Sequence, residues 1–350
     1  MKLHSKPVRT GNNPAYQSRQ MVRHTKAAVD AYQAMTNADP SRAISPARQR
    51  EVREYARDHF GDAKHSPWLE LFAGWSGEFV KGCVPETYLV QYIVPYSVQP
   101  HGDILDNTLS SRTLASDRFP DIGYVLKGTL YDRDFNHVDP ATYAKQIFAD
   151  HPYIYLKQAT AFQGRGVARV NPGQFEAAIA RSNTAVLQYP LEMHDDLVEL
   201  SPSAAATLRI STISHQGETR AVGAYLRLGS VGDTHIISKS AFKITADLKS
   251  GKLFEFGTNK DWVPLSAHPD TGIPFFGTEI PHFQDAVAAV EDHHARVPHI
   301  SFIGWDVAIT KSDGPMFFES NAGHTGHVTH EANQGPIFAG TGWDQLHLKA

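Results

Sequence analysis

A lysine followed closely by paired glycines gives one segment of the sequence the residues that phosphate binding needs. Residues 155–170 contain Lys157 and, after a short stretch, Gly164-Arg165-Gly166. Glycines let backbone N–H groups approach phosphate oxygens closely, and a lysine on the neighbouring strand supplies the opposing charge. A plain β-hairpin closed by a glycine turn has the same pattern, so this segment alone allows both interpretations.

A second segment has the spacing of a hairpin that carries oxygen ligands. Its predicted strands are residues 303–310 and 316–321. Because side chains alternate across a strand, Glu319 and Asn321 share one face, and Asp306 on the partner strand can lie opposite them. Three such oxygen donors suit Mg²⁺, which usually keeps several waters and takes further ligands from substrate phosphates. The alternative is a solvated hairpin at the edge of a sheet.

The end of a third apolar run could form a hinge whose backbone pairs with an adenine edge. It comprises Gln188, Tyr189, Pro190 and Leu191, and the proline ends the strand pattern. Any strand end has a similar composition, so this segment is weak evidence on its own. The sequence lacks the signatures of Walker loops, dinucleotide folds, zinc proteases and serine hydrolases.

Three histidines near the C-terminus recur with a spacing of three residues. They are His324, His327 and His330, and they are followed by Glu331. This spacing suits a metal site on a helix or turn, but Gly326 and two β-branched residues disfavour a helix here. The sequence therefore favours contact with a substrate, or a solvated loop, over a transition-metal site.

The segments that would position these groups change in character near Asp106. Residues 14–35 and 46–60 place apolar side chains at helical spacing, so residues 1–100 are predicted to be mainly helical. Beyond Asp106, short apolar runs alternate with helical patterns, which favours an α+β or α/β body. The predicted strands include 124–126, 153–156, 185–187 and 208–213, and the predicted helices lie near 140–149, 172–181 and 282–294.

Composition limits the class of protein. The 350 residues include 33 Lys+Arg and 37 Asp+Glu, a formal charge of −4, which gives little support to nucleic-acid binding as the main role. A hydrophobic share of 41% without a long apolar run predicts a soluble protein of two or three lobes with no membrane association. A single cysteine, Cys83, and an N-terminus without an apolar run favour a cytoplasmic location.

Taken in order, these segments resemble the ATP-grasp fold, and more narrowly its sugar-transfer-associated and glutamate-ligase-related branch. The resemblance implies an α+β protein in which two lobes clasp ATP, with a mainly helical N-terminal region. It divides the chain into a helical region at 1–100, a small lobe with the lysine and glycine loop at 101–190, and a C-terminal lobe with the magnesium site at 191–350. The segments that carry the resemblance are 156–157, 164–166, 187–191, 207–212, 268–272, 277–281, 304–310 and 319–321.

The resemblance also implies a role for each candidate residue. Asp306, Glu319 and Asn321 would hold one or two Mg²⁺ ions, with Mn²⁺ as an alternative. Lys157 would act in catalysis as well as binding, and Arg209 would face the reacting carboxylate or its acyl phosphate. The residues implied to bind the nucleotide are Lys157, Gln163, Gly164, Arg165, Gly166, Gln188, Tyr189 and Leu191.

The activity that the resemblance implies is that of an ATP- and Mg²⁺-dependent ligase. It would convert a small-molecule carboxylate to an acyl phosphate with release of ADP, and would then join the acyl group to an amine or, less often, a thiol. A kinase of the same fold that phosphorylates a small-molecule hydroxyl is one alternative, and a degenerate, non-catalytic nucleotide-binding protein is another. The chain departs from the family pattern at Asn107, where a lysine is usual and for which Arg112 or Lys127 could substitute, and again at 235–242.

Overall fold

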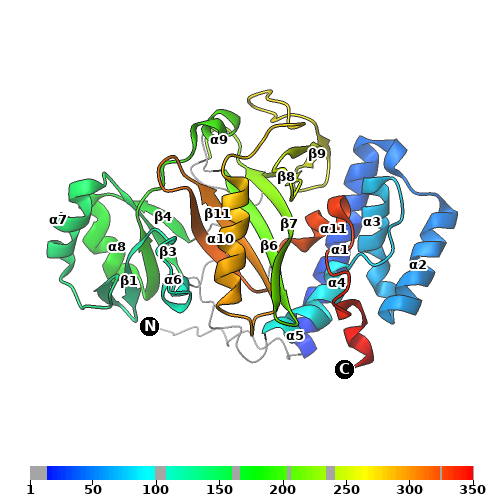
Figure 1. Cartoon of the computed structure of the whole chain (residues 1–350), viewed down its shortest axis with the longest axis horizontal. Coiled ribbons are helices and arrows are strands. Elements are labelled where there is room, and N and C mark those ends of the chain that lie inside the picture. The colour runs from blue at the N-terminus through cyan, green and yellow to red at the C-terminus, as the bar shows by residue number, and fades with distance from the viewer. Residues whose placement is uncertain are drawn as a thin grey trace.

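The computed structural model places a large central sheet between a small lobe and a layer of helices (Figure 1). The helical layer is built from the N-terminal third of the chain and from its C-terminal segment, which lie side by side in the figure. The structure describes residues 14–98, 108–159, 166–202, 206–233, 241–323 and 325–349, with side chains from residue 19 onward.

The helical layer contains the longest helices of the N-terminal region. α1 (Pro14–Ala38), α2 (Pro46–Phe60) and α3 (Ser66–Ser76) pack together through a shared apolar core. The Ser45 side chain accepts a hydrogen bond from a backbone N–H in the first turn of α2, with proline at the first position, so the sequence itself defines this start. Shorter helical segments follow: α4 (Glu86–Tyr88), η3 (Leu89–Ile93) and α5 (Val94–Val98).

The small lobe is a five-stranded antiparallel sheet covered on one face by helices. Its strand order is β2-β1-β5-β3-β4, and the helices α7 (Pro140–Asp150) and α8 (Phe175–Arg181) pack on the face that carries Leu156 and Leu187. The opposite face is therefore left for the large lobe. The strands are β1 (Asp121–Leu126), β2 (Thr129–Asp132), β3 (Ile154–Gln158), β4 (Val167–Val170) and β5 (Thr184–Gln188), and the short elements are α6 (Ser110–Thr113) and η5 (Pro172–Gln174).

The large lobe is a seven-stranded antiparallel sheet in the order β10-β9-β8-β7-β6-β11-β12. α10 (Phe283–Ala295) packs on its apolar face, in front of the sheet in Figure 1, and α11 (His327–Gln334) packs against β7 and β8. The strands are β6 (Thr207–His215), β7 (Glu218–Leu228), β8 (Phe242–Ala246), β9 (Leu253–Thr258), β10 (Pro264–Leu265), β11 (Phe302–Ile309) and β12 (Pro315–Asn321); α9 (Asp195–Leu200) precedes them and η6 (Trp343–Leu348) follows α11.

These elements confirm the predicted α+β class and the helical N-terminal region, but they correct one prediction. The segment after Gly326 is a helix, α11, although a helix was not expected there. Gly326 lies outside the helix in the left-handed region at φ 76°, so its low helix propensity carries no cost within it. The two β-branched residues each cost less than about 0.7 kcal/mol, which burial against the sheet and the helical layer offsets.

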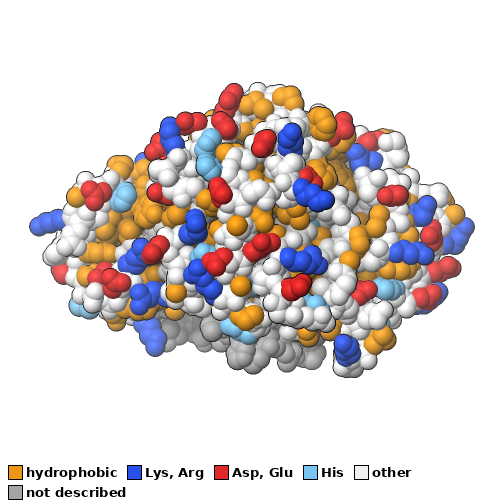
Figure 2. All heavy atoms as spheres, in the orientation of Figure 1, with side chains coloured by type: hydrophobic (Ala, Val, Ile, Leu, Met, Phe, Trp, Pro, Cys, Tyr) orange, Lys and Arg blue, Asp and Glu red, His pale blue; other side chains and the backbone are white. Residues whose placement is uncertain are grey.

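The surface adds two observations. Positive and negative side chains are interspersed on the face shown in Figure 2, as the near balance of charges predicts. Among the helices of the described ranges, none has the length and apolar character to cross a membrane.

Candidate nucleotide and metal site

The hairpin of β11 and β12 places the three predicted metal ligands together. Asp306 pairs directly with Glu319, and Gly304 pairs with Asn321, so all three oxygen-bearing side chains lie on one face of the sheet. The Asn321 amide donates a hydrogen bond of 3.0 Å to Oε1 of Glu319. The alternation expected from the sequence therefore produces a compact group of two carboxylates and one amide. In the described part of the chain, no group of three or more His, Cys, Asp or Glu side chains has an arrangement that could hold a metal ion.

Asp306 is held by two guanidinium groups. Arg209, which faces it from β6, donates from Nε to Oδ1 at 2.6 Å and from Nη2 to Oδ2 at 2.9 Å. Arg227 on β7 adds an ion pair of 2.5 Å to Oδ2. Burial disfavours the charged form of Asp306, but the two guanidinium groups outweigh burial and hold the pKa of this carboxyl well below its usual range. Asp306 is therefore ionised at any physiological pH.

Glu319 differs electrically from Asp306. Burial and the adjacent charge of Asp306 raise the pKa of Glu319, while the bond from Asn321 and the charge of Lys157 act in the opposite direction. Two carboxyl groups facing each other repel when both are ionised, and a divalent cation between them would relieve that repulsion. The donor set of Asp306, Glu319 and Asn321 thus fits Mg²⁺ or Mn²⁺ in chemical type.

Lys157 reaches this group from the other lobe. Its Nζ lies 3.5 Å from the backbone oxygen of Phe318 and 5.2 Å from the centre of the Phe318 ring. Burial lowers the pKa of Lys157, whereas the carboxylates Glu319, Asp121 and Asp306 favour its charged form. The two lobes therefore meet where a cation from β3 faces the carboxylates of the β11–β12 hairpin.

The predicted adenine hinge follows β5 at the same junction. The Gln188 amide donates a 2.7 Å hydrogen bond to Oδ1 of Asp121, so its side chain is occupied within the small lobe. The backbone N–H of Tyr189 donates to the oxygen of Pro120 at 3.0 Å. The backbone hydrogen bonds of the described chain leave the N–H of Leu191 without a protein acceptor, so it could donate to an adenine nitrogen.

Several predicted residues are not placed at this site. Gln163, Gly164 and Arg165 lie outside the described residues, as does Asn107, and Gly166 is described only as the turn residue that precedes β4. Of the two proposed substitutes for a lysine at position 107, Arg112 forms an ion pair of 3.6 Å with Asp134 and lies over the Phe135 ring. Lys127 is exposed at the turn between β1 and β2. Neither belongs to the group of charges around Lys157.

The histidine segment has a structural position that the sequence did not indicate. His324 lies outside the described residues, whereas His327 and His330 are fully buried rather than solvated. Nε2 of His330 lies 3.0 Å from the Ser211 hydroxyl, and its ring packs 5.1 Å from that of Tyr225. Burial lowers the pKa of His330 to about 3, so it stays neutral beneath the face that carries Arg209.

Sequence reasoning missed three charged residues that the structure places at this junction or on the strands beside it. Asp121 stands at the start of β1, Arg227 lies two positions beyond Tyr225 on β7, and Lys243 on β8 pairs directly with Arg227. Each lies outside the motifs, and only the strand order reveals its neighbours. Period-two alternation within β7 was the available signal, because Tyr225 and Arg227 alternate with the apolar residues 224, 226 and 228.

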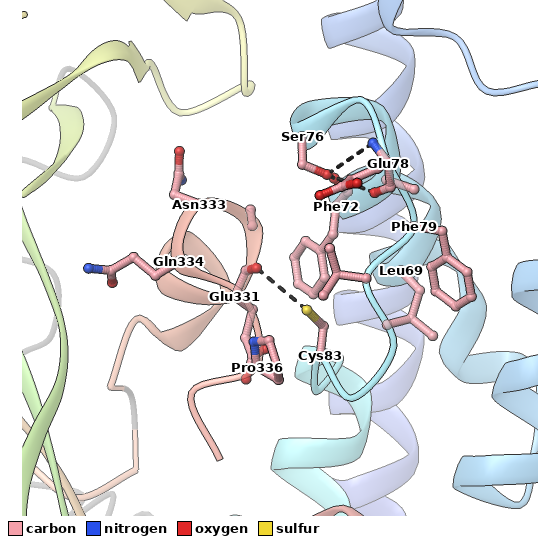
Figure 3. A pocket seen from close by; sticks show the side chains of 14 residues that line it. Leu69, Phe72, Ser76, Glu78, Phe79, Cys83, Glu331, Asn333, Gln334 and Pro336 are labelled. Carbon is pink, nitrogen blue, oxygen red and sulfur yellow. Dashed lines mark hydrogen bonds between the residues drawn. The ribbon is translucent and has the colours of Figure 1, made fainter. Parts of the chain in front are cut away.

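A separate cavity of about 300 Å³ lies on the other side of α11, between that helix and α3 (Figure 3). Apolar side chains such as Leu69 and Phe72 form one wall, and Glu331, Asn333 and Gln334 contribute from α11. Because His330 on the same helix faces the large sheet, α11 separates this cavity from the carboxylate group.

The chain resembles one family of known proteins. The model of a family described as sugar-transfer associated ATP-grasp matches residues 162–339, which are 178 of the 350 residues. No curated protein matches the chain.

Similar solved structures include three enzymes. Carboxyaminoimidazole ribonucleotide synthase from Aspergillus clavatus, in complex with ATP, is 12% identical with a TM-score of 0.36 over 63% of this chain and 45% of that one. Biotin carboxylase from Campylobacter jejuni is 10% identical with a TM-score of 0.44 over 70% of this chain and 45% of that one. D-cycloserine synthetase is 15% identical with a TM-score of 0.42 over 72% of this chain and 73% of that one. The chain thus spans less than half the length of the first two.

Proposed function

Since the chain belongs to the family of sugar-transfer associated ATP-grasp proteins, we propose that it is an ATP- and Mg²⁺-dependent ligase that joins a small-molecule carboxylate to an amine. The fold supports ATP-dependent ligase chemistry in general, and the carboxylate, the amine and the ADP-forming route are our proposal. The observation that carries it is the meeting of Lys157 from the small lobe with Asp306 and Glu319 from the large lobe.

The chain's own residues divide the work of binding the nucleotide. Lys157 would neutralise the phosphates, and the free N–H of Leu191 would receive the adenine. Asp306, Glu319 and Asn321 would hold the metal ion, since two carboxylates and an amide match the oxygen ligands that Mg²⁺ prefers. When bound, Mg²⁺ would neutralise phosphate charge and orient the reacting oxygens.

The proposed reaction has two balanced steps. A carboxylate oxygen of the substrate attacks the γ-phosphorus of ATP, and the bond from that phosphorus to the ADP oxygen breaks, which yields an acyl phosphate. The amine nitrogen then attacks the acyl carbon, phosphate leaves with the electrons of the C–O bond, and the nitrogen loses a proton to water. The chain contributes orientation and fixed positive charge, which stabilise the negative charge that develops in both steps.

Arg209 has a different place in this proposal from the one that the sequence suggested. It was expected to face the reacting carboxylate, but its Nε and Nη2 both bind Asp306. We therefore assign it as a positioning residue that fixes the Asp306 carboxylate toward the metal. A guanidinium suits this task because it binds a carboxylate with two parallel hydrogen bonds and stays charged.

ADP release tests the proposal directly. The full chain is incubated with ATP, Mg²⁺ and pools of carboxylic acids and amines, and we expect ADP and phosphate to form only when an acid and an amine are both present. The Glu319→Ala variant should lose this turnover, and the matched variant Asp313→Ala, at the exposed turn of the same hairpin, should retain it. Formation of AMP and pyrophosphate in place of ADP would contradict the acyl-phosphate route.

The saturation of Asp306 by two guanidinium groups favours a second candidate, a nucleotide-binding protein without turnover. Both carboxylate oxygens already have partners, which weakens Asp306 as a metal ligand. In that case, Mg²⁺ and ATP should raise the melting temperature while no pool releases ADP. A kinase would be distinguished by a stable phosphorylated product that forms without an amine.

A further inference from the structure

The polar face of the large sheet extends beyond the metal-binding group toward β8. One row of paired positions crosses the sheet from Glu319 through Asp306, Arg209 and Tyr225 to Thr245. The neighbouring row pairs Arg227 with Lys243. Because these strands alternate, the apolar residues between them face α10, and the polar set faces the small lobe and α11.

Positive charge accumulates at the β8 end of this face. Arg209 and Arg227 share the single carboxylate of Asp306, and Lys243 brings a further positive charge one strand farther on. Within the described chain, Lys243 has no carboxylate within ion-pair distance, and its Nζ lies 6.0 Å from the centre of the Tyr225 ring. The buried Nε of Arg227 has no hydrogen-bond partner among the described residues.

Among the described residues, no carboxylate forms an ion pair with Lys243. His330 lies beneath Tyr225, and burial holds it in the neutral form with a pKa of about 3. Residues 229–241 connect β7 to β8 and contain one acidic residue, Asp233, whose carboxylate accepts a hydrogen bond of 3.0 Å from the backbone N–H of Ser230. A partly buried cation with no anionic partner is costly, so this end of the face is suited to an anion that comes from outside the chain.

We propose that Arg227 and Lys243 bind a second anionic group of the acceptor acid, so that the substrate is a dianionic acid. This inference rests on the proposed function, because it names the substrate class of the same site. The carboxylate to be activated would lie beside the metal-binding group, and the second carboxylate or phosphate would lie at β7 and β8. An arginine guanidinium and a lysine ammonium can bind either group, since carboxylates and phosphates both present anionic oxygens.

Strand spacing sets the expected size of this acid. Asp306 on β11 and Lys243 on β8 are three strands apart, which is roughly 14 Å between their backbones at a spacing of about 4.8 Å. The Arg227 guanidinium already reaches Oδ2 of Asp306 at 2.5 Å, so the two acidic groups should be separated by a short chain. A diacid of about four to six carbons has that length.

The test compares acids that differ only in the second charge. ADP release by the full chain is measured with Mg²⁺, ATP and an amine pool, using succinate, glutarate and adipate against butyrate, pentanoate and hexanoate. Phosphoglycolate serves as the arm that carries a phosphate. We expect the dianionic acids to have at least a tenfold higher kcat/KM.

In Lys243→Met, the KM for the dianionic acid should rise at least tenfold while the KM for ATP stays unchanged. The exposed Lys252→Met is the matched control and should behave as the native chain.

A binding measurement separates this inference from the proposed function. The melting temperature is recorded without ATP, with glutarate, phosphoglycolate or pentanoate. Stabilisation of the native chain by a dianion, lost in Lys243→Met and retained in Lys252→Met, supports the inference even if no acid releases ADP, in which case the ligase proposal alone fails. If the monoacids serve as well as the diacids in turnover, or if no dianion stabilises the chain or is turned over, the inference is overturned.

Discussion

At the scale of single residues, the three predicted metal ligands are electrically unequal. Asp306 is ionised and already neutralised by Arg209 and Arg227, so it contributes little net charge to an incoming cation. Glu319 has a raised pKa because it is buried and faces Asp306. Charge for the metal must therefore come mainly from ionisation of Glu319, and Asn321 adds a neutral oxygen ligand.

The first prediction follows from that inequality. A carboxyl group binds a metal ion in its ionised form, so binding of Mg²⁺ should release the proton of Glu319, and Mg²⁺ affinity should rise as pH increases through its raised pKa. We expect the rise in melting temperature caused by Mg²⁺ and ADP to grow between pH 5 and pH 8 in the native chain. Glu319→Gln should lose most of this pH dependence, whereas Asp313→Asn should keep it. An unchanged pH dependence in Glu319→Gln would assign the ionising group elsewhere.

The sequence allowed Asp306 and Glu319 to be predicted as neighbours for a physical reason. The partners Asp306 and Glu319 lie on adjacent strands of one hairpin, where alternation and a short turn fix which side chains meet. Arg227 and Lys243 come from strands whose place in the sheet depends on pairing across the whole lobe, and nothing in their local spacing records that pairing. Local patterns thus predicted the hairpin, while the cations that surround it required the strand order.

At the scale of elements, α11 lies between the polar face of the large sheet and the cavity beside α3. One side of the helix places His330 against Ser211 on the large sheet, and the other side lines the cavity beside α3. The sequence disfavoured a helix here because its composition is poor for an isolated helix. Burial between two layers decides the outcome, since most helical stability in proteins comes from packing of this kind.

A second prediction concerns the buried acid of α11. Glu331 is 2% exposed, and burial raises its pKa well above the ordinary value of 4.5, although the backbone N–H groups near Val84 and Ile337 favour the ionised form. Neither carboxyl oxygen has a well-formed hydrogen bond to a described residue. A carboxyl whose pKa is raised by folding lowers stability progressively as pH rises above its unfolded value, by at most about 1.4 kcal/mol per pH unit.

The measurement compares unfolding of the native chain and of Glu331→Gln from pH 5 to pH 8. The stability of the native chain relative to that of the glutamine variant should fall as pH rises through this range, because the variant cannot ionise at this position. Histidines whose pKa is lowered by burial, such as His294 at about 4, act at the acidic end, where stability falls as pH falls. Parallel pH profiles for the two proteins would show that Glu331 keeps its ordinary pKa.

At the scale of the whole molecule, the described residues form three hydrophobic cores, and the N-terminal helices and the C-terminal segment share one of them. The core of the helical layer contains Met35 and Phe60 from the N-terminal helices together with Phe338 and Trp343 from the C-terminal segment. The division into regions 1–100, 101–190 and 191–350 remains a prediction, and the structure adds that apolar residues between 332 and 346 pack with the first region. A composition shift marks where a lobe begins, but it cannot show that the chain returns to an earlier layer.

The last prediction tests whether packing of the C-terminal segment on the helical layer stabilises the whole chain. Trp343 is 2% exposed, and its ring lies 5.7 Å from that of Tyr96 in α5 and 5.6 Å from that of His215 at the end of β6. Replacing a buried tryptophan by alanine typically costs about 3–5 kcal/mol, because apolar contact is lost and a cavity remains. We expect Trp343→Ala to lower the melting temperature of the whole chain, as seen by calorimetry. Leu348→Ala, at a position that is 72% exposed in the same segment, should leave it nearly unchanged. If only a minor early transition shifted, the helical layer would unfold independently of the two sheets. A single shifted transition would instead mean that the helical layer and the two sheets form one cooperative unit.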